Sequence, residues 1–197
     1  MSHKTVTVAE LVTWFKCPRQ YYRYYKAGSR PGSPGDSCVA GYMVDHAIKR
    51  FLNKRTYIEE FREVQIRKHL SREIRKELDF VFSQNKRGDE IYKHCKKMCE
   101  NFLGWLFQKM KRNYLTFFDW NLALAEARPR PEKLLYDRAF GFRGKPDGFV
   151  KENGVWVPVD YKSTTDVTPE TSFQITLYTI LSKHLSGDMP GYGKVLM

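Results

Sequence analysis

The stretch from Phe140 to Lys162 reads FGFRGKPDGFVKENGVWVPVDYK and decides how the chain folds. Two apolar-rich runs flank Asn153-Gly154, the dipeptide best suited to a two-residue type I′ hairpin turn, because both of its positions tolerate positive φ. Strand pairing that is symmetric about this turn places Asp147 opposite Asp160. The sequence therefore predicts a β-hairpin with two carboxylates that face each other.

Two like charges that lie directly opposite on one face of a hairpin repel, unless a positive charge lies between them. A divalent cation is the obvious candidate, because carboxylate oxygens hold Mg²⁺ or Mn²⁺. Lys162 lies two residues beyond Asp160, so the period of 2 along a strand sends its ammonium out on the same face as both carboxylates. A metal ion with a nearby cation can activate water and neutralise charge that develops on a phosphate. The alternative is a surface hairpin whose charges are solvated.

Four short motifs follow one another along most of the chain. Their order resembles that of the PD-(D/E)XK nuclease superfamily, and more closely its RecB-like branch, which includes the CRISPR-associated Cas-four exonucleases and their viral relatives. That branch is marked by a Gly-x-x-x-x-His helix, a Gly-x-Pro-Asp strand, an Asp-x-Lys strand and a Gln-x-x-x-Tyr helix. The corresponding segments here are Gly41–His46, Gly144–Asp147, Asp160–Lys162 and Gln174–Tyr178.

The resemblance implies an α/β fold, with a restriction-endonuclease-like mixed sheet core that is flanked by helices and carries a helical insertion. It also implies a metal site for Mg²⁺ or Mn²⁺. The ligands carried over from the family are His46, Asp147, Asp160 and the backbone carbonyl of Tyr161.

The resemblance assigns catalysis to Asp147, Asp160 and Lys162, with Lys162 orienting the attacking water and stabilising the charged transition state. Gln174 and Tyr178 correspond to a family pair that contacts DNA and braces the active site. The implied activity is that of a metal-dependent DNA nuclease, an exonuclease acting on single-stranded DNA or DNA ends by water attack on the phosphodiester.

The alternative function is a noncatalytic DNA-binding clamp subunit of a helicase or CRISPR integrase complex. The acidic and lysine positions of the motifs are all retained, which favours the enzyme. The expected partners are DNA and a helicase, a recombination protein or a CRISPR adaptation protein.

The composition favours a globular protein that meets a polyanion. With 197 residues, 42% of them hydrophobic, the chain can bury a core as one RecB-like domain. We expect an N-terminal helical segment with the histidine helix at 1–56, a helical insertion at 57–112, and the sheet with the catalytic core at 121–197. A formal charge of +12 and a pI near 9.5 favour a polyanionic partner.

No stretch resembles a signal peptide, and no apolar run approaches the roughly 20 residues that span a bilayer. We therefore expect no membrane association and a cytoplasmic protein, or one inside the host cell if it is viral.

The N-terminal segment, residues 7–25, is predicted to be helical and is interrupted by Pro18. Its tyrosines alternate with basic residues, and aromatic rings can stack on bases while arginines meet phosphates. The alternative is that the tyrosines form a packing layer. The candidate DNA-binding residues of this segment are Arg19, Tyr21, Tyr22 and Arg23.

The segment also resembles the Cys-Pro-x-x-Tyr run of Cas-four proteins, whose cysteine ligates an iron–sulfur cluster, so Cys17 inherits that role. Family members with a cluster use three further cysteines near the C-terminus, whereas no cysteine follows Cys99 here. Either the chain lacks the cluster, or a C-terminal part is missing, or the four cysteines are arranged differently.

Apolar residues at helical spacing predict three helices in the middle of the chain. Val44, Ala47, Ile48 and Phe51 form a buried stripe that leaves His46 on its margin. Residues 57–82 and 89–111 are predicted to be two further helices, the second with a core stripe at Ile91, Cys95, Met98, Phe102 and Trp105. Cys95 and Cys99 are accordingly predicted to be buried and inert.

Three further expectations concern the catalytic half. Residues 121–127 are a short apolar run with Glu126 as a candidate entry-strand carboxylate or an ordinary exposed glutamate, and residues 128–131 are predicted to end any helix and lead toward the sheet. Residues 134–142 are predicted to form the strand before the Pro-Asp strand, with Gly141 and Gly144 allowing a sharp bend or a close backbone approach. Thr168-Pro169-Glu170 is predicted to begin a helix.

Overall fold

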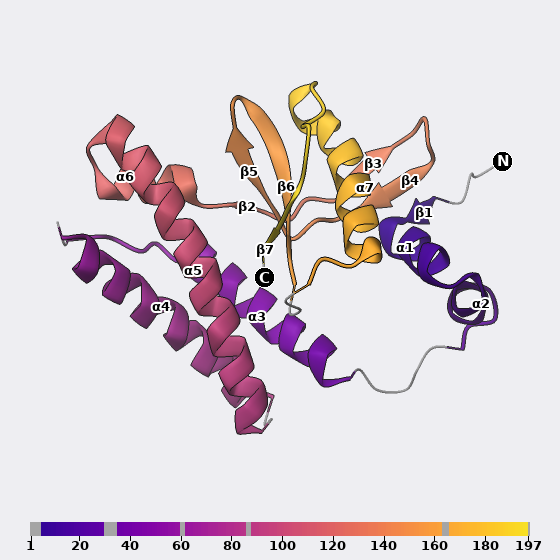
Figure 1. Ribbon diagram of the computed structural model, residues 1–197, viewed down its shortest axis with the longest axis horizontal. Helices are drawn as coiled ribbons and strands as arrows, with labels where there is room; N and C mark the ends of the chain where they lie inside the picture. The colour runs from indigo at the N-terminus through magenta and orange to yellow at the C-terminus, as the bar shows by residue number, and fades with distance from the viewer. Residues whose placement is uncertain (1–4, 30–34, 60–61, 86–87, 163–165, 197) are drawn as a thin grey trace. The chain divides into compact units, whose positions relative to one another are not determined.

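The computed structural model describes residues 5–29, 35–59, 62–85, 88–162 and 166–196 (Figure 1). The fold is mixed α/β, with sheets flanked by helices, as the sequence predicted. The chain divides into two compact units: the first comprises residues 1–34, 130–160 and 164–195, and the second comprises 35–129, 161–163 and 196–197.

The first unit holds the strands and the helices at both ends of the chain. Its N-terminal elements are β1 (Val6–Thr7), α1 (Val8–Lys16), α2 (Pro18–Tyr21) and a short π-helix (Tyr22–Lys26). The strands that follow are β2 (Arg130–Pro131), β3 (Leu135–Asp137), β4 (Phe142–Gly144), β5 (Gly148–Glu152) and β6 (Val155–Tyr161). The last elements are α7 (Pro169–Ser186) and β7 (Lys194–Leu196).

Two sheets are formed, one in the order β1-β4-β3 and one in the order β2-β5-β6-β7. In the first sheet β1 runs parallel to β4, and β3 runs antiparallel to it. In the second, the pairs β2–β5 and β5–β6 are antiparallel. Helix α7 connects β6 to β7 in the chain and begins with Thr168 as its N-cap, as predicted.

The β5–β6 hairpin confirms the predicted turn and its register. Asn153 and Gly154 both have positive φ, 49° and 86°, as a type I′ turn requires. The strand partners run from Glu152↔Val155 at the turn to Gly148↔Val159 at the far end. This is the pairing that the position of Asn153-Gly154 predicted.

The single strand predicted over 134–142 is wrong, because the chain turns back between β3 and β4. Gly141 adopts a φ of 67°, and the carboxylate of Asp137 accepts the backbone N–H groups of Ala139 and Phe140. These local hydrogen bonds offer the backbone a turn in place of a continuous strand.

The N-terminal helix begins one residue later than predicted, because Val6–Thr7 pairs with β4 as a strand. Thr7 closes a capping box with Glu10, since each side chain accepts the backbone N–H of the other residue. The helix ends before Pro18, and α2 restarts with that proline in its first turn, where a missing N–H costs nothing.

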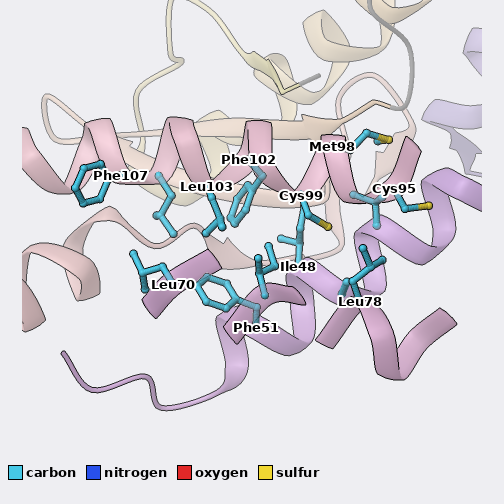
Figure 2. Close-up of a cluster of buried hydrophobic side chains, with 14 of the residues drawn as sticks. Ile48, Phe51, Leu70, Leu78, Cys95, Met98, Cys99, Phe102, Leu103 and Phe107 are labelled. Carbon is cyan, nitrogen blue, oxygen red and sulfur yellow. The ribbon is translucent and has the colours of Figure 1, made fainter. Parts of the chain in front are cut away.

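The second unit contains four helices among its described residues: α3 (Asp36–Asn53), α4 (Glu63–Ser83), α5 (Asp89–Phe117) and α6 (Trp120–Ala127). Their apolar faces form one core, part of which Figure 2 shows. The predicted stripe of α3 is buried, and so are Cys95, Met98 and Phe102 of the predicted α5 stripe. Ile91 and Trp105 are half-buried against the same core.

The predicted start of the insertion helix at residue 57 is wrong, because residues 57–59 are not helical. The side chain of Asn121 fixes Ile58 instead: its Oδ1 accepts the Ile58 N–H at 2.8 Å and its Nδ2 donates to the Ile58 carbonyl at 3.0 Å. Both backbone groups of Ile58 are thus satisfied without a helix.

Residues 121–127 lie in helix α6, and the segment that follows leads into the sheet as predicted, since Arg130–Pro131 is strand β2. Asp119 caps this helix by accepting the N–H groups of Asn121 and Leu122. Glu126 is an exposed residue of that helix, so its interpretation as an entry-strand carboxylate is wrong.

Candidate active site

The candidate site is built on the open end of the β5–β6 hairpin. Asp147 immediately precedes β5 and Asp160 follows Val159 in β6, so both aspartates lie next to the last paired residues of the hairpin, Gly148 and Val159. Asp160 is 4% exposed and Asp147 is half-buried. The carboxylate of Asp160 is therefore held away from bulk water beside a second carboxylate.

Helix α7 adds Tyr178 to this pair. The Tyr178 side chain is buried, and this burial is the main reason why its pKa is raised to about 12. The negative charges of Asp160 and Asp147 raise the pKa further, which shows that the phenol lies within electrostatic reach of both carboxylates. Gln174 Nε2 donates to the Tyr178 hydroxyl at 3.2 Å and partly opposes the rise. The structure thus brings together four residues that the sequence singled out.

Gly144 allows this arrangement, because two helices pack directly against its backbone. A Cβ atom at this position would lie 2.6 Å from Cγ2 of Val8 and 2.9 Å from both Cε1 of Tyr178 and Cδ1 of Leu181. Real Cβ atoms essentially never make contacts this short. The close approach predicted for Gly144 is therefore confirmed, and it seats the Tyr178 ring on β4.

Tyr161 and Lys162 continue the chain after Asp160 and belong to the second unit. The N–H of Lys162 donates to the carbonyl of Leu196 at 2.9 Å, and the Tyr161 ring packs edge-on against Phe102 with centroids 5.6 Å apart. A backbone hydrogen bond of Lys162 and a ring contact of Tyr161 thus hold these two residues in place within the second unit. The roles of the Lys162 ammonium and the Tyr161 carbonyl stay predictions.

His46 lies on helix α3 of the second unit, as predicted, at the margin of the buried stripe. Its ring packs at a tilt against Tyr42, with centroids 4.1 Å apart, and its Nδ1 lies 3.9 Å from Oδ2 of Asp45. Almost half of the side chain is exposed, so a ring nitrogen is accessible to a ligand. Among the residues that the structure describes, no group of three His, Cys, Asp or Glu side chains is gathered around one point, so metal binding by His46 stays a prediction.

The aspartate pair fits the metal that the sequence analysis expected. Two carboxylates at one end of the hairpin supply hard oxygen donors, and a divalent cation would remove the repulsion between them.

The candidate DNA-binding residues near the N-terminus differ in exposure. Tyr22 is 64% exposed, and Arg19 and Arg23 are exposed as well. Tyr21 is half-buried and stacks on Tyr25, with ring centroids 5.4 Å apart. The exposed ring of Tyr22 is therefore accessible to a base. The stacking of Tyr21 on Tyr25 instead agrees with the alternative in which the tyrosines form a packing layer.

A second buried carboxylate, Asp137, was not predicted from the sequence. Its side chain is 1% exposed, and Oδ2 lies 2.9 Å from Nζ of Lys183 and 3.0 Å from Nε2 of His184. These bonds, together with the backbone N–H of Phe140, hold the pKa of Asp137 well below its usual range, with Lys183 as the largest cause. The sequence could not predict this contact, because no characteristic spacing relates Asp137 at the end of a strand to Lys183 and His184 in the last turn of a distant helix.

The four cysteines are free. Burial raises the pKa of Cys95 to about 11 and that of Cys99 to about 12, so both thiols stay protonated, as the prediction of inert cysteines requires. Cys38 is exposed and Cys17 is half-buried. Nothing in the described part of the chain supports the iron–sulfur role that the resemblance gave to Cys17.

The fold and the aspartate pair agree with what comparison of the sequence with protein families finds. The family model of the PD-(D/E)XK nuclease superfamily matches residues 5–195. The chain belongs to this superfamily, and it is therefore a member of a class of nucleases that generally use Mg²⁺ or Mn²⁺ and act on DNA. No curated protein and no solved structure matches the chain.

Among the described residues, no helix combines the length and the apolar character needed to cross a membrane.

Proposed function

We propose that this chain is a metal-dependent DNA nuclease that hydrolyses phosphodiesters in single strands or at DNA ends, as an exonuclease. The observation that carries the proposal is that Asp147 and Asp160 both lie at the open end of the β5–β6 hairpin, within electrostatic reach of the buried Tyr178. Membership of the nuclease superfamily supports it.

In this proposal Asp147 and Asp160 hold Mg²⁺ or Mn²⁺, together with His46 and the Tyr161 carbonyl. When bound, such an ion acidifies water and neutralises charge on the phosphate. Lys162 orients the attacking water and stabilises the negative charge that develops on the phosphate oxygens.

The helix α7 pair has two separate roles in the proposal. Tyr178 is buried, so its ring braces the two aspartates. Gln174 is half-buried on the same helix face, and its amide contacts DNA. At the N-terminus, the exposed Tyr22 stacks on an unpaired base while Arg19 and Arg23 meet phosphates, which favours single-stranded DNA as substrate.

The test is incubation of the purified protein with end-labelled single-stranded and double-stranded DNA, with Mg²⁺, with Mn²⁺ and with chelator. Metal-dependent degradation that starts at an end, with the single strand cut faster, is expected. The matched control is Asp160→Asn, which keeps the size of the side chain and removes the charge. Binding of DNA without cleavage in any metal would instead favour the noncatalytic clamp.

The proposed protein partners, a helicase, a recombination protein or a CRISPR adaptation protein, rest on the resemblance to the RecB-like branch. Co-purification of the tagged protein from its native cells tests them. Recovery of the nuclease with a DNA-processing protein, retained after nuclease treatment of the lysate, is the expected result.

A further inference from the structure

A hollow on the outer face of helix α4 is lined almost entirely by cationic and polar side chains. It has a volume of about 500 Å³ and lies in the second unit, whereas the two aspartates lie in the first. Its lining residues all come from one helix: Val64, Arg67, Lys68, Ser71, Arg72 and Arg75.

Two acidic residues of α4, Glu73 and Glu77, are buried. Glu77 pairs with Arg50 of α3, and Glu73 pairs with Lys54, the residue that follows α3, and with Lys76 of α4. Lys54 Nζ lies 2.9 Å from Glu73 Oε2, and Arg50 Nε lies 2.8 Å from Glu77 Oε2. The short ion pairs of these two glutamates are therefore made with Arg50, Lys54 and Lys76, and not with the cations that line the hollow.

The outer cations have few local counter-charges. Within the described part of the chain, Arg67 and Lys68 form no ion pair. Arg75 lies 3.8 Å from Glu100, and Arg72 lies 3.9 Å from Glu73, which are long distances between groups that are more than half exposed on the arginine side. Such pairs contribute little, so the cations stay available to an external anion.

The spacing of these side chains matches a linear polyanion. The cations from Arg67 to Arg75 recur on one helix face over about 12 Å, at a rise of about 1.5 Å per residue. Along the axis of B-form DNA the charges of one strand follow one another at a rise of about 3.4 Å, so a row of this length faces more than one phosphate. Ser71 adds a hydroxyl donor between the cations, and the described residues that line the hollow include no carboxylate.

We infer that the outer face of α4 binds the phosphate backbone of DNA, and we call Arg67, Lys68, Arg72 and Arg75 the α4 cation track. The inference rests on the proposed function for the choice of DNA as the polyanion. The track makes contacts to phosphates alone, so it adds affinity without sequence preference. The cations of the track contribute to the chain's formal charge of +12, and the inference names DNA as their binding partner.

The test compares two variants that lose the same charge. In the track variant, Arg67, Lys68, Arg72 and Arg75 are all changed to Gln. In the control variant, four exposed cations of the same unit that lie off the hollow, Arg55, Lys93, Lys97 and Arg112, are changed to Gln. Binding of labelled single-stranded DNA is measured by fluorescence anisotropy in chelator at several salt concentrations, so that no cleavage occurs.

Neutralising a phosphate contributes about 0.7 to the slope of log K against log salt for a single strand. We expect the track variant to lose about 2 to 3 from this slope and to bind at least tenfold more weakly at low salt, while the control variant changes much less. Replacing the three arginines of the track by lysine should preserve the slope, because the charge remains. Equal losses in both Gln variants, or an unchanged slope in the track variant, would overturn the inference.

Two further measurements keep this test independent of the proposed function. Cleavage of the small diester bis(p-nitrophenyl) phosphate with Mn²⁺ should be the same in the wild type and the track variant. If neither protein cleaves it but the track variant still loses DNA affinity, the α4 cation track is supported and the nuclease proposal fails.

The second measurement is binding of polyglutamate by both proteins. If the track variant loses affinity for polyglutamate while the salt dependence of its DNA binding is unchanged, the surface binds an acidic protein and the inference is overturned. If the fourfold variant does not fold, the single changes Lys68→Glu and Lys97→Glu provide the same comparison.

Discussion

Because Gly144 has no side chain, Val8, Tyr178 and Leu181 can pack directly against its backbone. Its backbone is covered by Val8, Tyr178 and Leu181, each within 3 Å of where a Cβ atom would lie. Val8 and Leu181 are fully buried, the β-branched Val8 is stiff at χ1, and the Tyr178 ring is rigid. A methyl group at Gly144 therefore strains the packing of all three side chains.

The first prediction is that Gly144→Ala destabilises the protein by about 1–3 kcal/mol, the usual cost of overpacking a dense core. Thermal unfolding measures the loss, and any nuclease activity should fall as Tyr178 shifts. Gly104→Ala is the control, because nothing lies within 4 Å of a Cβ atom there and helical alanine is favoured over glycine by about 1 kcal/mol. Equal stability changes in the two variants would contradict the packing explanation.

The second prediction concerns Tyr22. Tyr22→Ala should weaken binding of single-stranded DNA by about 1–3 kcal/mol, the usual value of one stacked base, and leave duplex binding nearly unchanged. Anisotropy titrations with both substrates in chelator measure this. Tyr21→Ala is the matched control, since its ring already stacks on Tyr25. Equal losses on single and double strands would mean that Tyr22 has a packing role.

At the scale of single residues, the features that could be predicted are those set by local spacing. The positive φ of Asn153 and the close approach at Gly144 follow from residue types that tolerate them. The bonds of Asp137 to Lys183 and His184 could not be predicted, because the partners are separated by 46 and 47 positions and no repeating pattern relates them.

Among the elements, the hydrogen bonds of Asp137 join the end of β3 to the last turn of α7. The same carboxylate closes the β3–β4 turn through the N–H groups of Ala139 and Phe140. Because α7 also carries Gln174 and Tyr178, this anchor fixes the helix that braces the candidate site.

The third prediction is that Asp137→Asn lowers the free energy of unfolding by about 3 kcal/mol, since it leaves charged partners of a buried group uncompensated. The folded-state pKa of Asp137 is lowered, so its stabilising effect is present above the unfolded pKa of about 3.9 and is lost as the pH falls below it. Denaturant unfolding of both proteins from pH 7 to pH 3 checks this, and their difference should shrink toward acid.

Lys183→Met alone and combined with Asp137→Asn provides the control. If the two residues act as a pair, the double variant should lose less than the sum of the single losses. Additive losses, or a difference that does not depend on pH, would contradict the anchor.

Elements with a strong period could be predicted, and elements fixed by distant contacts could not. The stripes of α3 and α5 and the β5–β6 register follow from periods that read directly from the sequence. The late start of α4 follows the contact of Asn121 with Ile58, 63 positions away. Residues 121–127 have an apolar pattern too short to distinguish a helix from a strand, and the Asp119 cap resolves it.

For the whole molecule, the two compact units divide the motifs between them. The Gly-x-Pro-Asp motif and the Gln-x-x-x-Tyr helix lie in the first unit, and the histidine helix packs with α4 and α5 in the second. The Asp-x-Lys motif spans the boundary between Asp160 and Tyr161. A sequence read in order cannot reveal this division, because the first unit is assembled from three separate segments.

The fourth prediction concerns the thiols of the whole chain. In native protein a thiol reagent should label Cys38 rapidly and Cys17 more slowly, while Cys95 and Cys99 react only after denaturation, because burial keeps them protonated. Protein purified without oxygen should accordingly contain far less than one iron per chain. Stoichiometric iron with absorbance near 400 nm would show that a cluster forms after all.

In the proposed mechanism Asp160 binds the metal ion and Lys162 stabilises the transition state. Alanine variants of the two residues distinguish these roles. Asp160→Ala removes an oxygen ligand and a charge, so Mn²⁺ affinity and DNA cleavage should fall together, while DNA affinity holds or rises. Lys162→Ala should leave Mn²⁺ affinity nearly intact, because an ammonium is not a metal ligand.

The most direct measurement is the single-turnover rate of cleavage of end-labelled single-stranded DNA by Lys162→Ala at saturating Mn²⁺, with metal affinity measured by calorimetry on the same protein. We predict a rate lower than that of the wild type by about 10²–10³-fold, the usual effect of losing one group that stabilises the transition state. Cleavage at the wild-type rate would contradict the assignment of the active site to this hairpin.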